Sequence, residues 1–157
     1  MNKHFTKSGY CSLLREKLDA ADFTILSQNF HQSAHLVKQA KKDQLLGITA
    51  EEKAVVQQWL EYRVTRVDGR SSKDDTRIIL KDLNIHLEDK VYLAGNIFTL
   101  ADVLMYYGLH HADLTVQEKE EYLNVSRWFN HIQHYPGVRQ HLSNVVFIKN
   151  RLYTNAH

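Results

Sequence analysis

The sequence predicts an all-helical domain, and three observations support this prediction. A single proline, Pro136, and six glycines in 157 residues leave long stretches without a residue that breaks a helix. Four times, a Ser or Thr is followed three positions later by an acidic residue, which is the reciprocal capping pattern of a helix start. Apolar residues then recur at spacings of three and four residues. With 43% apolar residues, one compact unit with a buried core is expected.

Four helices are expected to begin at these capping signals, over residues 49–69, 72–90, 99–111 and 115–135. The first of them ends at Gly69, which disfavours continuation of the helix. The capping pairs are, in chain order, Thr49 with Glu52, Ser72 with Asp75, Thr99 with Asp102, and Thr115 with Glu118.

The remaining segments carry weaker signals. Residues 31–42 are predicted to form one more helix, and a short helix is expected after Pro136, because proline is tolerated in a first helical turn. Residues 145–148 are expected to pack back on the bundle as an extended segment. In the first thirty residues, the pattern is compatible with a short helix over 12–21 and a short strand over 23–27.

Charge and cysteine content exclude several classes of protein. Lys and Arg number 20 against 18 Asp and Glu without a basic stripe, which argues against a dedicated nucleic-acid-binding domain. Lys149 and Arg151 beside Phe147 and Tyr153 are too few to indicate direct tRNA binding. Cys11, the single cysteine, cannot form an internal disulfide, and no apolar stretch has the length of a signal-peptide core or a membrane span. A cytoplasmic or nuclear protein is therefore expected.

Metal binding and cysteine chemistry are not predicted either. His131 and His134 have the i, i+3 spacing of two ligands on one helix face, but no HExxH motif or cysteine cluster supplies further ligands. Cys11 has no neighbouring base that the sequence identifies, so a buried or unreactive thiol is expected.

The most specific local signal lies in VYLAGNIFTLADVLMYY, residues 91–107. Thr99 and Asp102 are predicted to form a reciprocal cap, with Phe98 packing on Val103 across it. We interpret Asp102 as a structural cap and not as a catalytic acid.

This segment resembles the capped helix of the glutathione transferase C-terminal domain. It matches the family pattern at Tyr92, Leu93, Gly95, Thr99, Ala101 and Asp102, and YLNVSRWFNHIQHYPGVRQ resembles the closing helix of that domain. The resemblance implies a glutathione transferase C-terminal-like helical bundle over residues 34–157. Residues 1–33 would be a short, reduced N-terminal segment, either a remnant of the thioredoxin-like subdomain or irregular.

Within this superfamily, the sequence is similar to auxiliary subunits of the multi-tRNA-synthetase complex, for example in AHLVKQAKKDQLLGITAEEKAVVQQWLEYRV and VVFIKNRLYTN. The resemblance implies a non-catalytic scaffold without a cofactor. It implies methionyl-tRNA synthetase, glutamyl-prolyl-tRNA synthetase and other glutathione transferase-like domains as partners, and a further nuclear role in DNA-damage signalling. Neither membrane nor nucleic acid is expected as a partner.

The alternative is a glutathione transferase-type enzyme. Members of that family hold the peptide through a cis-proline loop in a domain of about eighty residues, whereas no proline precedes Pro136 here. Gln32 and Ser33 resemble the residue pair that binds the glutamyl group, but an N-cap serine explains them equally well. We therefore predict a protein that is not an enzyme.

Two docking faces are expected. The pairing of domains in the superfamily implies a first face on residues 35–42 and on the helix over 49–69, where exposed Arg63 and Arg66 would form a polar rim.

The second face is expected around Arg127. If Tyr122, Val125, Phe129 and Ile132 face inward, Arg127 is turned outward by about 200 degrees, and Trp128 could shield its pairing with a partner carboxylate. A solvated arginine, or one paired with Glu120 or Glu121 of its own helix, remains the alternative.

Overall fold

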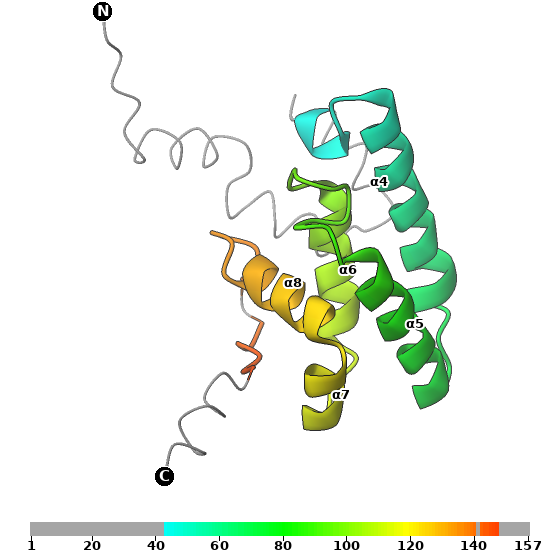
Figure 1. Ribbon diagram of the computed structural model, residues 1–157, viewed down its shortest axis with the longest axis vertical. Coiled ribbons are helices and arrows are strands. Elements are labelled where there is room, and N and C mark those ends of the chain that lie inside the picture. The colour runs from blue at the N-terminus through cyan, green and yellow to red at the C-terminus, as the bar shows by residue number, and fades with distance from the viewer. Residues whose placement is uncertain (1–42, 141, 148–157) are drawn as a thin grey trace, which may run out of the picture.

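The computed structural model describes residues 43–140 and 142–147 (Figure 1). Its elements are the 3-10 turn η2 (Asp43–Leu46), α4 (Ala50–Tyr62), the π-helical turn η3 (Arg63–Val67), α5 (Lys73–His86), α6 (Leu100–His110), α7 (Val116–Glu121) and α8 (Leu123–Gln133). Within these ranges the fold is all-helical, as predicted, and contains no strand beyond a single bridge between Tyr92 and Gly95. No helix in this part is long and apolar enough to cross a membrane. The predictions for residues 1–42 lie outside the described residues.

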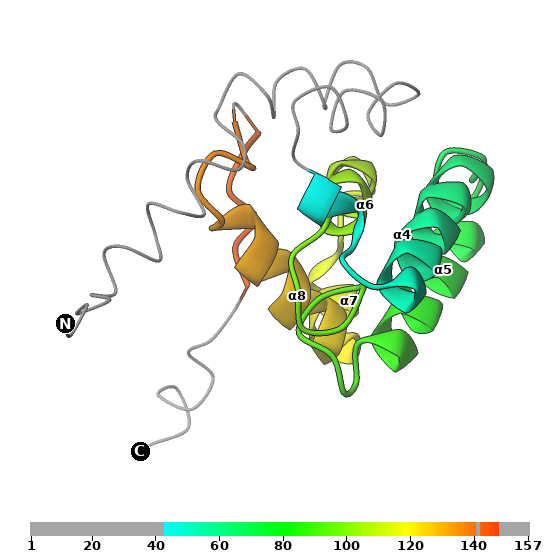
Figure 2. The same cartoon turned by 90° about the horizontal axis from the view of Figure 1, so that it is seen from above.

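Helix α6 forms the centre of the bundle. All of its residues from Leu100 to Leu109 are buried. α4 and η3 pack on α6, and α8 packs both on α6 and on α5, as the view in Figure 2 shows. A helix that is apolar on all sides must be surrounded by other elements, so α6 determines where the flanking helices stand.

The helix starts agree with the capping pattern. At α4 the Glu52 N–H donates to Thr49 Oγ1 at 3.2 Å, while Glu52 Oε2 accepts from the Thr49 N–H at 3.0 Å. The same exchange begins α5 at Ser72 and Asp75, and α7 at Thr115 and Glu118. Each pair satisfies backbone donors that no helical carbonyl can reach, and all four predicted starts are confirmed.

One helix prediction was wrong in its extent. The predicted helix over 115–135 is two helices, because Tyr122 has φ −102° and ψ 69° and interrupts the hydrogen-bond ladder. The first N–H groups of α8 are capped from α5 instead: Asn84 Oδ1 accepts from the N–H of Asn124 at 3.0 Å and of Val125 at 3.4 Å. The helix predicted over 49–69 ends beside Gly69 as expected, but its last turn widens into the π-helical turn η3.

The helix expected after Pro136 is a series of turns. Gly137 and Gln140 have φ of 85° and 53°, and these left-handed conformations prevent a right-handed helix. The turn is held because the carbonyl of buried Val138 accepts a 2.8 Å hydrogen bond from the Tyr107 hydroxyl.

The segment after this turn packs back on the bundle, as predicted for residues 145–147. Gln133 Nε2 donates to the Val145 carbonyl at 2.8 Å, and the Val145 N–H donates to Gln133 Oε1 at 2.9 Å. The ring of Phe147 lies 5.6 Å from that of Phe129 between centroids. Position 148 is not among the described residues.

Candidate docking faces

Asp102 joins three parts of the bundle. Its fully buried carboxylate accepts hydrogen bonds from the Thr99 N–H at 3.0 Å, the Leu93 N–H at 3.0 Å and Trp128 Nε1 at 2.8 Å. Burial raises the pKa of Asp102 to about 6, against the opposing effect of these hydrogen bonds. The geometry is that of a structural cap, which also ties α6 to α8.

Trp128 belongs to the core and not to the surface. Its side chain is fully buried and its indole N–H is used by Asp102, so it cannot shield a contact made by Arg127 with a partner. The spacing explains this correction, because Trp128 follows Val125 by three residues and precedes Ile132 by four, on the inward stripe of α8.

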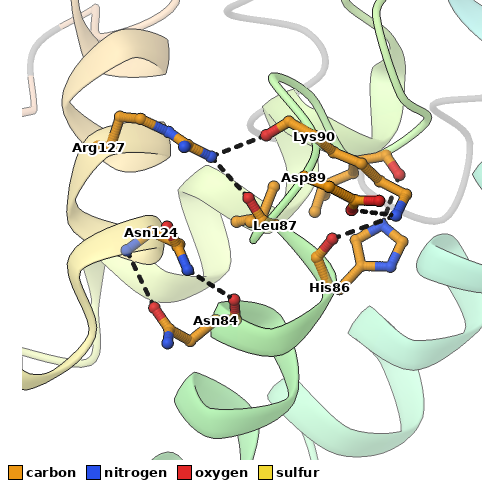
Figure 3. Close-up of polar contacts among 8 residues, drawn as sticks. Asn84, His86, Leu87, Asp89, Lys90, Asn124 and Arg127 are labelled. Carbon is orange, nitrogen blue, oxygen red and sulfur yellow. Dashed lines mark hydrogen bonds and ion pairs between the residues drawn. The ribbon is translucent and has the colours of Figure 1, made fainter.

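Arg127 is exposed, as the helical spacing predicted, but its guanidinium is engaged (Figure 3). Its Nη2 donates to the carbonyls of Leu87 at 2.7 Å and of Lys90 at 2.8 Å. These carbonyls lie at the C-terminal end of α5, where the helix dipole favours a positive charge and the last carbonyls lack helical partners. The arginine is therefore not freely solvated, and its Nη2 is not held by Glu120 or Glu121. Its Nη1 and Nε form no hydrogen bond with another described residue.

Arg127 is one member of a row of contacts that α8 and Tyr135 after it make with the end of α5, the connector between α5 and α6, and the start of α6. In chain order, Asn124 bonds to Asn84, Arg127 to Leu87 and Lys90, Trp128 to Asp102 and His131 to Tyr92, and Tyr135 stacks on Phe98. The Tyr92 hydroxyl lies 3.0 Å from His131 Nε2, and the rings of Phe98 and Tyr135 are 4.0 Å apart. The row holds the connector against α8, so the surface around Arg127 is preorganised.

The first face contains a groove of about 230 Å³ between η3 and α5. Exposed Arg66 lines it together with Tyr62 and Asp82, whose side chains share a hydrogen bond of 3.0 Å. Burial, followed by the hydrogen bond to Asp82, raises the pKa of Tyr62. Ile78 also lines this groove and is exposed, so an apolar contact lies beside the predicted rim arginine. Ile78 was not predicted from the sequence, because it falls outside the apolar stripe of its helix.

Arg63 does not belong to this rim. Only 12% of its side chain is exposed, and its Nη1 pairs with Asp68 Oδ2 at 2.8 Å. The side chain packs against Gly108 of α6, where an added Cβ would meet Arg63 and would lie 2.9 Å from Val67 Cγ1. Burial lowers the pKa of Arg63. The expectation of an exposed Arg63 is corrected, because position 63 follows buried Val56 and Trp59 on the stripe that faces α6.

The structure separates the two remaining arginines. Arg66 lies on η3, which continues α4, and Arg127 lies on α8; η3 and α8 each pack on α6 and on α5 (Figures 1 and 2). The part of the first face expected at residues 35–42 lies outside the described residues.

No group of three possible metal ligands occurs in the described part of the chain. His134 Nδ1 lies 2.7 Å from the Asn130 carbonyl of its own helix.

Comparison with known proteins identifies the family. Residues 52–136 match a protein family described as nuclear-export cofactor Arc1p. The chain is 77% identical over 127 residues to eukaryotic translation elongation factor 1 epsilon-1 of Homo sapiens, covering 80% of this chain and 73% of that protein. For the protein of the same name from Mus musculus, the identity is 75% over 127 residues, with the same shares covered.

A more distant relative supports the fold. Glutathione S-transferase stcT of Emericella nidulans is 30% identical over 117 residues, which cover 60% of this chain and 54% of that protein. The helical bundle thus has a glutathione transferase-like fold. The chain belongs to the Arc1p-like family and, within it, to the eukaryotic translation elongation factor 1 epsilon-1 proteins.

Proposed function

We propose that this chain is a non-catalytic scaffold subunit of a multi-tRNA-synthetase complex. The names of its relatives associate them with translation elongation. The observation that carries the proposal is the presence of an exposed arginine on each of two different elements, Arg66 on η3 and Arg127 on α8, which both pack on α6. Two different faces allow one small domain to bridge two partners, which a single isologous surface cannot do.

The partners we propose are the glutathione transferase-like domains of methionyl-tRNA synthetase and glutamyl-prolyl-tRNA synthetase. Methionyl-tRNA synthetase would dock on the groove of Arg66 and Ile78, where an apolar side chain lies beside a charged rim. Glutamyl-prolyl-tRNA synthetase would dock around Arg127, whose Nη1 and Nε can bind a carboxylate while Nη2 remains bonded to α5. A cytoplasmic location, with an additional nuclear role in DNA-damage signalling, belongs to the same proposal.

The absence of catalysis is also proposed. Among the described residues the most buried carboxylate is that of Asp102, which accepts its hydrogen bonds from structural donors and has no exposed surface. The competing function, a glutathione transferase-type enzyme, is favoured by the relationship to stcT. Saturable conjugation of glutathione to a chlorodinitrobenzene-type electrophile by the pure chain would decide for the enzyme.

The scaffold proposal is tested by reconstitution with the two purified synthetase domains. Arg66→Glu should abolish methionyl-tRNA synthetase binding at low salt and leave the other partner bound, whereas Arg127→Ala should reduce glutamyl-prolyl-tRNA synthetase affinity about thirtyfold. Arg77→Ala is a matched control, because Arg77 is an exposed arginine of α5 that pairs only loosely with Asp74 at 3.7 Å. Loss of both partners from either variant, or of neither partner from both variants, would contradict the two-face arrangement.

A further inference from the structure

Two basic side chains are neighbours where α8 meets the connector between α5 and α6. Arg127 and His131 are both exposed and lie one helical turn apart on α8, a spacing that places Cβ atoms about 6 Å from each other. Arg127 bonds to the carbonyls of Leu87 and Lys90, and His131 bonds to the Tyr92 hydroxyl. Both side chains therefore reach the same short stretch of the chain, from the end of α5 into the connector (Figure 3).

Each of these two side chains is fixed through one nitrogen and has other nitrogens that remain available. Arg127 uses Nη2 for both of its hydrogen bonds, which leaves Nη1 and Nε. His131 Nε2 lies 3.0 Å from the Tyr92 hydroxyl, while its Nδ1 forms no hydrogen bond within the described part of the chain. Because a hydroxyl can both donate and accept, the contact with Tyr92 is possible whether or not Nε2 carries a proton. His131 can therefore become a cation without losing its position.

The described residues supply no counter-ion for this pair. None of their carboxylates forms an ion pair with Arg127 or His131. Asp89 of the connector pairs with Lys90 at 2.8 Å instead. An anion that neutralises the pair therefore has to come from outside the described bundle. The other charged or titratable groups on the elements around His131 are His86 of α5, Glu88 and Tyr92 of the connector, Asp102 of α6, His134 of α8 and Tyr135 after it.

The surroundings of the pair favour an acidic segment of a protein over a polynucleotide. Glu88 and Asp89 are exposed on the connector, and their charges oppose a continuous row of phosphates. Two carboxylates one turn apart on a partner helix have the same spacing as Arg127 and His131. A guanidinium group binds a carboxylate through two parallel N–H groups. Val91, which is 51% exposed on the same connector, offers an apolar contact beside the charges.

We propose that Arg127 and His131 form a two-point site for an acidic segment of a protein partner, and that docking there is linked to the uptake of one proton by His131. A carboxylate beside the imidazole favours its charged form. Affinity therefore rises as pH falls through the range near neutrality in which histidine side chains titrate, by at most about tenfold per pH unit for one proton. This inference rests on the proposed docking of a synthetase domain at Arg127 and adds its regulation by pH.

The first test measures proton uptake by calorimetric titration of the full chain with the glutamyl-prolyl-tRNA synthetase domain, in buffers that differ in ionisation enthalpy. At about pH 7 the parent should take up about one half to one proton more than His131→Gln, because glutamine cannot titrate. His111→Gln is the matched control. His111 is exposed at the end of α6 opposite to Asp102, and its replacement should leave proton uptake at the parent value. Equal proton uptake by the parent and His131→Gln overturns the inference.

The second test compares affinities between about pH 8 and about pH 6.5. The Kd of the parent should fall about fourfold over this range, and His131→Gln should lose most of this change while it binds like the parent at about pH 8. Melting temperatures show that each variant is folded.

The outcomes separate this inference from the proposed function. A domain that depends on Arg127 but binds the parent without this pH dependence overturns the inference alone. A domain that does not bind, or that binds Arg127→Ala as tightly as the parent, overturns the docking face and the inference with it. Displacement of the domain by a polynucleotide at about 0.15 M salt would assign the pair to phosphates and overturn the carboxylate site.

Discussion

Asp102 links the start of α6 to the connector before it and to α8, through its bonds to Thr99, Leu93 and Trp128. A buried carboxylate is costly unless its oxygens accept hydrogen bonds. Here three donors supply them, and two of these donors lie outside the helix that Asp102 caps. The residue therefore has the burial and raised pKa often associated with catalysis, while its geometry is structural.

Removal of the carboxylate should destabilise the fold more than removal of the hydroxyl. Asp102→Ala leaves three donors without an acceptor, two of them backbone groups, and we expect a loss of about 3 kcal/mol or more in unfolding free energy. Thr99→Ala should cost only about 0.5–1 kcal/mol, because the Thr99 hydroxyl contacts the carboxylate at 3.5 Å. Urea unfolding of both variants measures the difference. Parent-like stability of Asp102→Ala would show that the network is not structural.

The raised pKa of Asp102 gives stability a defined dependence on pH. In the folded state the carboxyl of Asp102 has a pKa of about 6, so it is protonated below about pH 6. In the unfolded state its pKa has the ordinary value of an aspartate, so it is protonated only at lower pH. Between these values the folded state holds more protons, so unfolding free energy rises as pH falls from about 7 to about 4, by up to about 3 kcal/mol.

Comparison with Asp102→Asn isolates this contribution, because the amide cannot titrate in that range. The unfolding free energy of the parent should increase relative to that of the variant as the solution is acidified. A difference that is constant with pH would mean that the pKa of Asp102 is not raised in the folded state.

At the scale of elements, the connector between α5 and α6 depends on α8 for its position. Arg127 closes the end of α5 by bonding to the carbonyls of Leu87 and Lys90, and His131 and Tyr135 continue the contact further along. A connector held at several points presents a defined surface at low entropic cost.

Arg127→Ala should therefore loosen the connector as well as remove a binding group. Loss of two charge-assisted bonds at an exposed helix end should cost about 1 kcal/mol. Amide hydrogen exchange should accelerate at Lys90 and Val91, and Arg77→Ala should leave exchange there unchanged. If Arg127→Ala exchanges like the parent at these amides, the arginine contributes to binding alone.

The sequence predicted those features of the elements that local chemistry determines. The four capping pairs lie within three residues, so each helix start was visible, and the spacing of α8 correctly turned Arg127 outward. Features set by distant contacts were not visible, such as the break at Tyr122 capped from Asn84 and the carbonyl partners of Arg127. Trp128 was within reach of the sequence, since its spacing from Val125 places it on the inward stripe.

At the scale of the whole molecule, both proposed faces are built on elements that pack on the central helix α6. η3 packs on α6 through Val67 and Arg63, and α8 packs on it through Trp128. Coupling between two sites requires an element with two discrete arrangements. The elements of both faces are held on α6 by buried side chains such as Val67 and Trp128, so we expect α6 to keep one position when a partner binds.

Binding at one face should thus leave the other unaffected. Saturation with the methionyl-tRNA synthetase domain should change the affinity for the glutamyl-prolyl-tRNA synthetase domain by less than about threefold, below the roughly fivefold to 150-fold typical of allosteric coupling. Calorimetric titration of the two domains in either order measures the factor by which one partner changes the affinity for the other. The two orders must give the same factor. A larger factor would mean that the partners touch one another or that the bundle changes on binding.

The cap that Asn84 provides for α8 has a consequence for the order of folding. Asn124 and Val125 donate to an amide oxygen forty residues earlier in the chain, and Tyr122 supplies no side-chain cap of its own. A helical nucleus is unfavourable unless its first donors find acceptors. We therefore expect the first turn of α8 to consolidate after α5 has formed and docked, so substitutions of Asn84 should increase the unfolding rate more than they decrease the folding rate in refolding experiments.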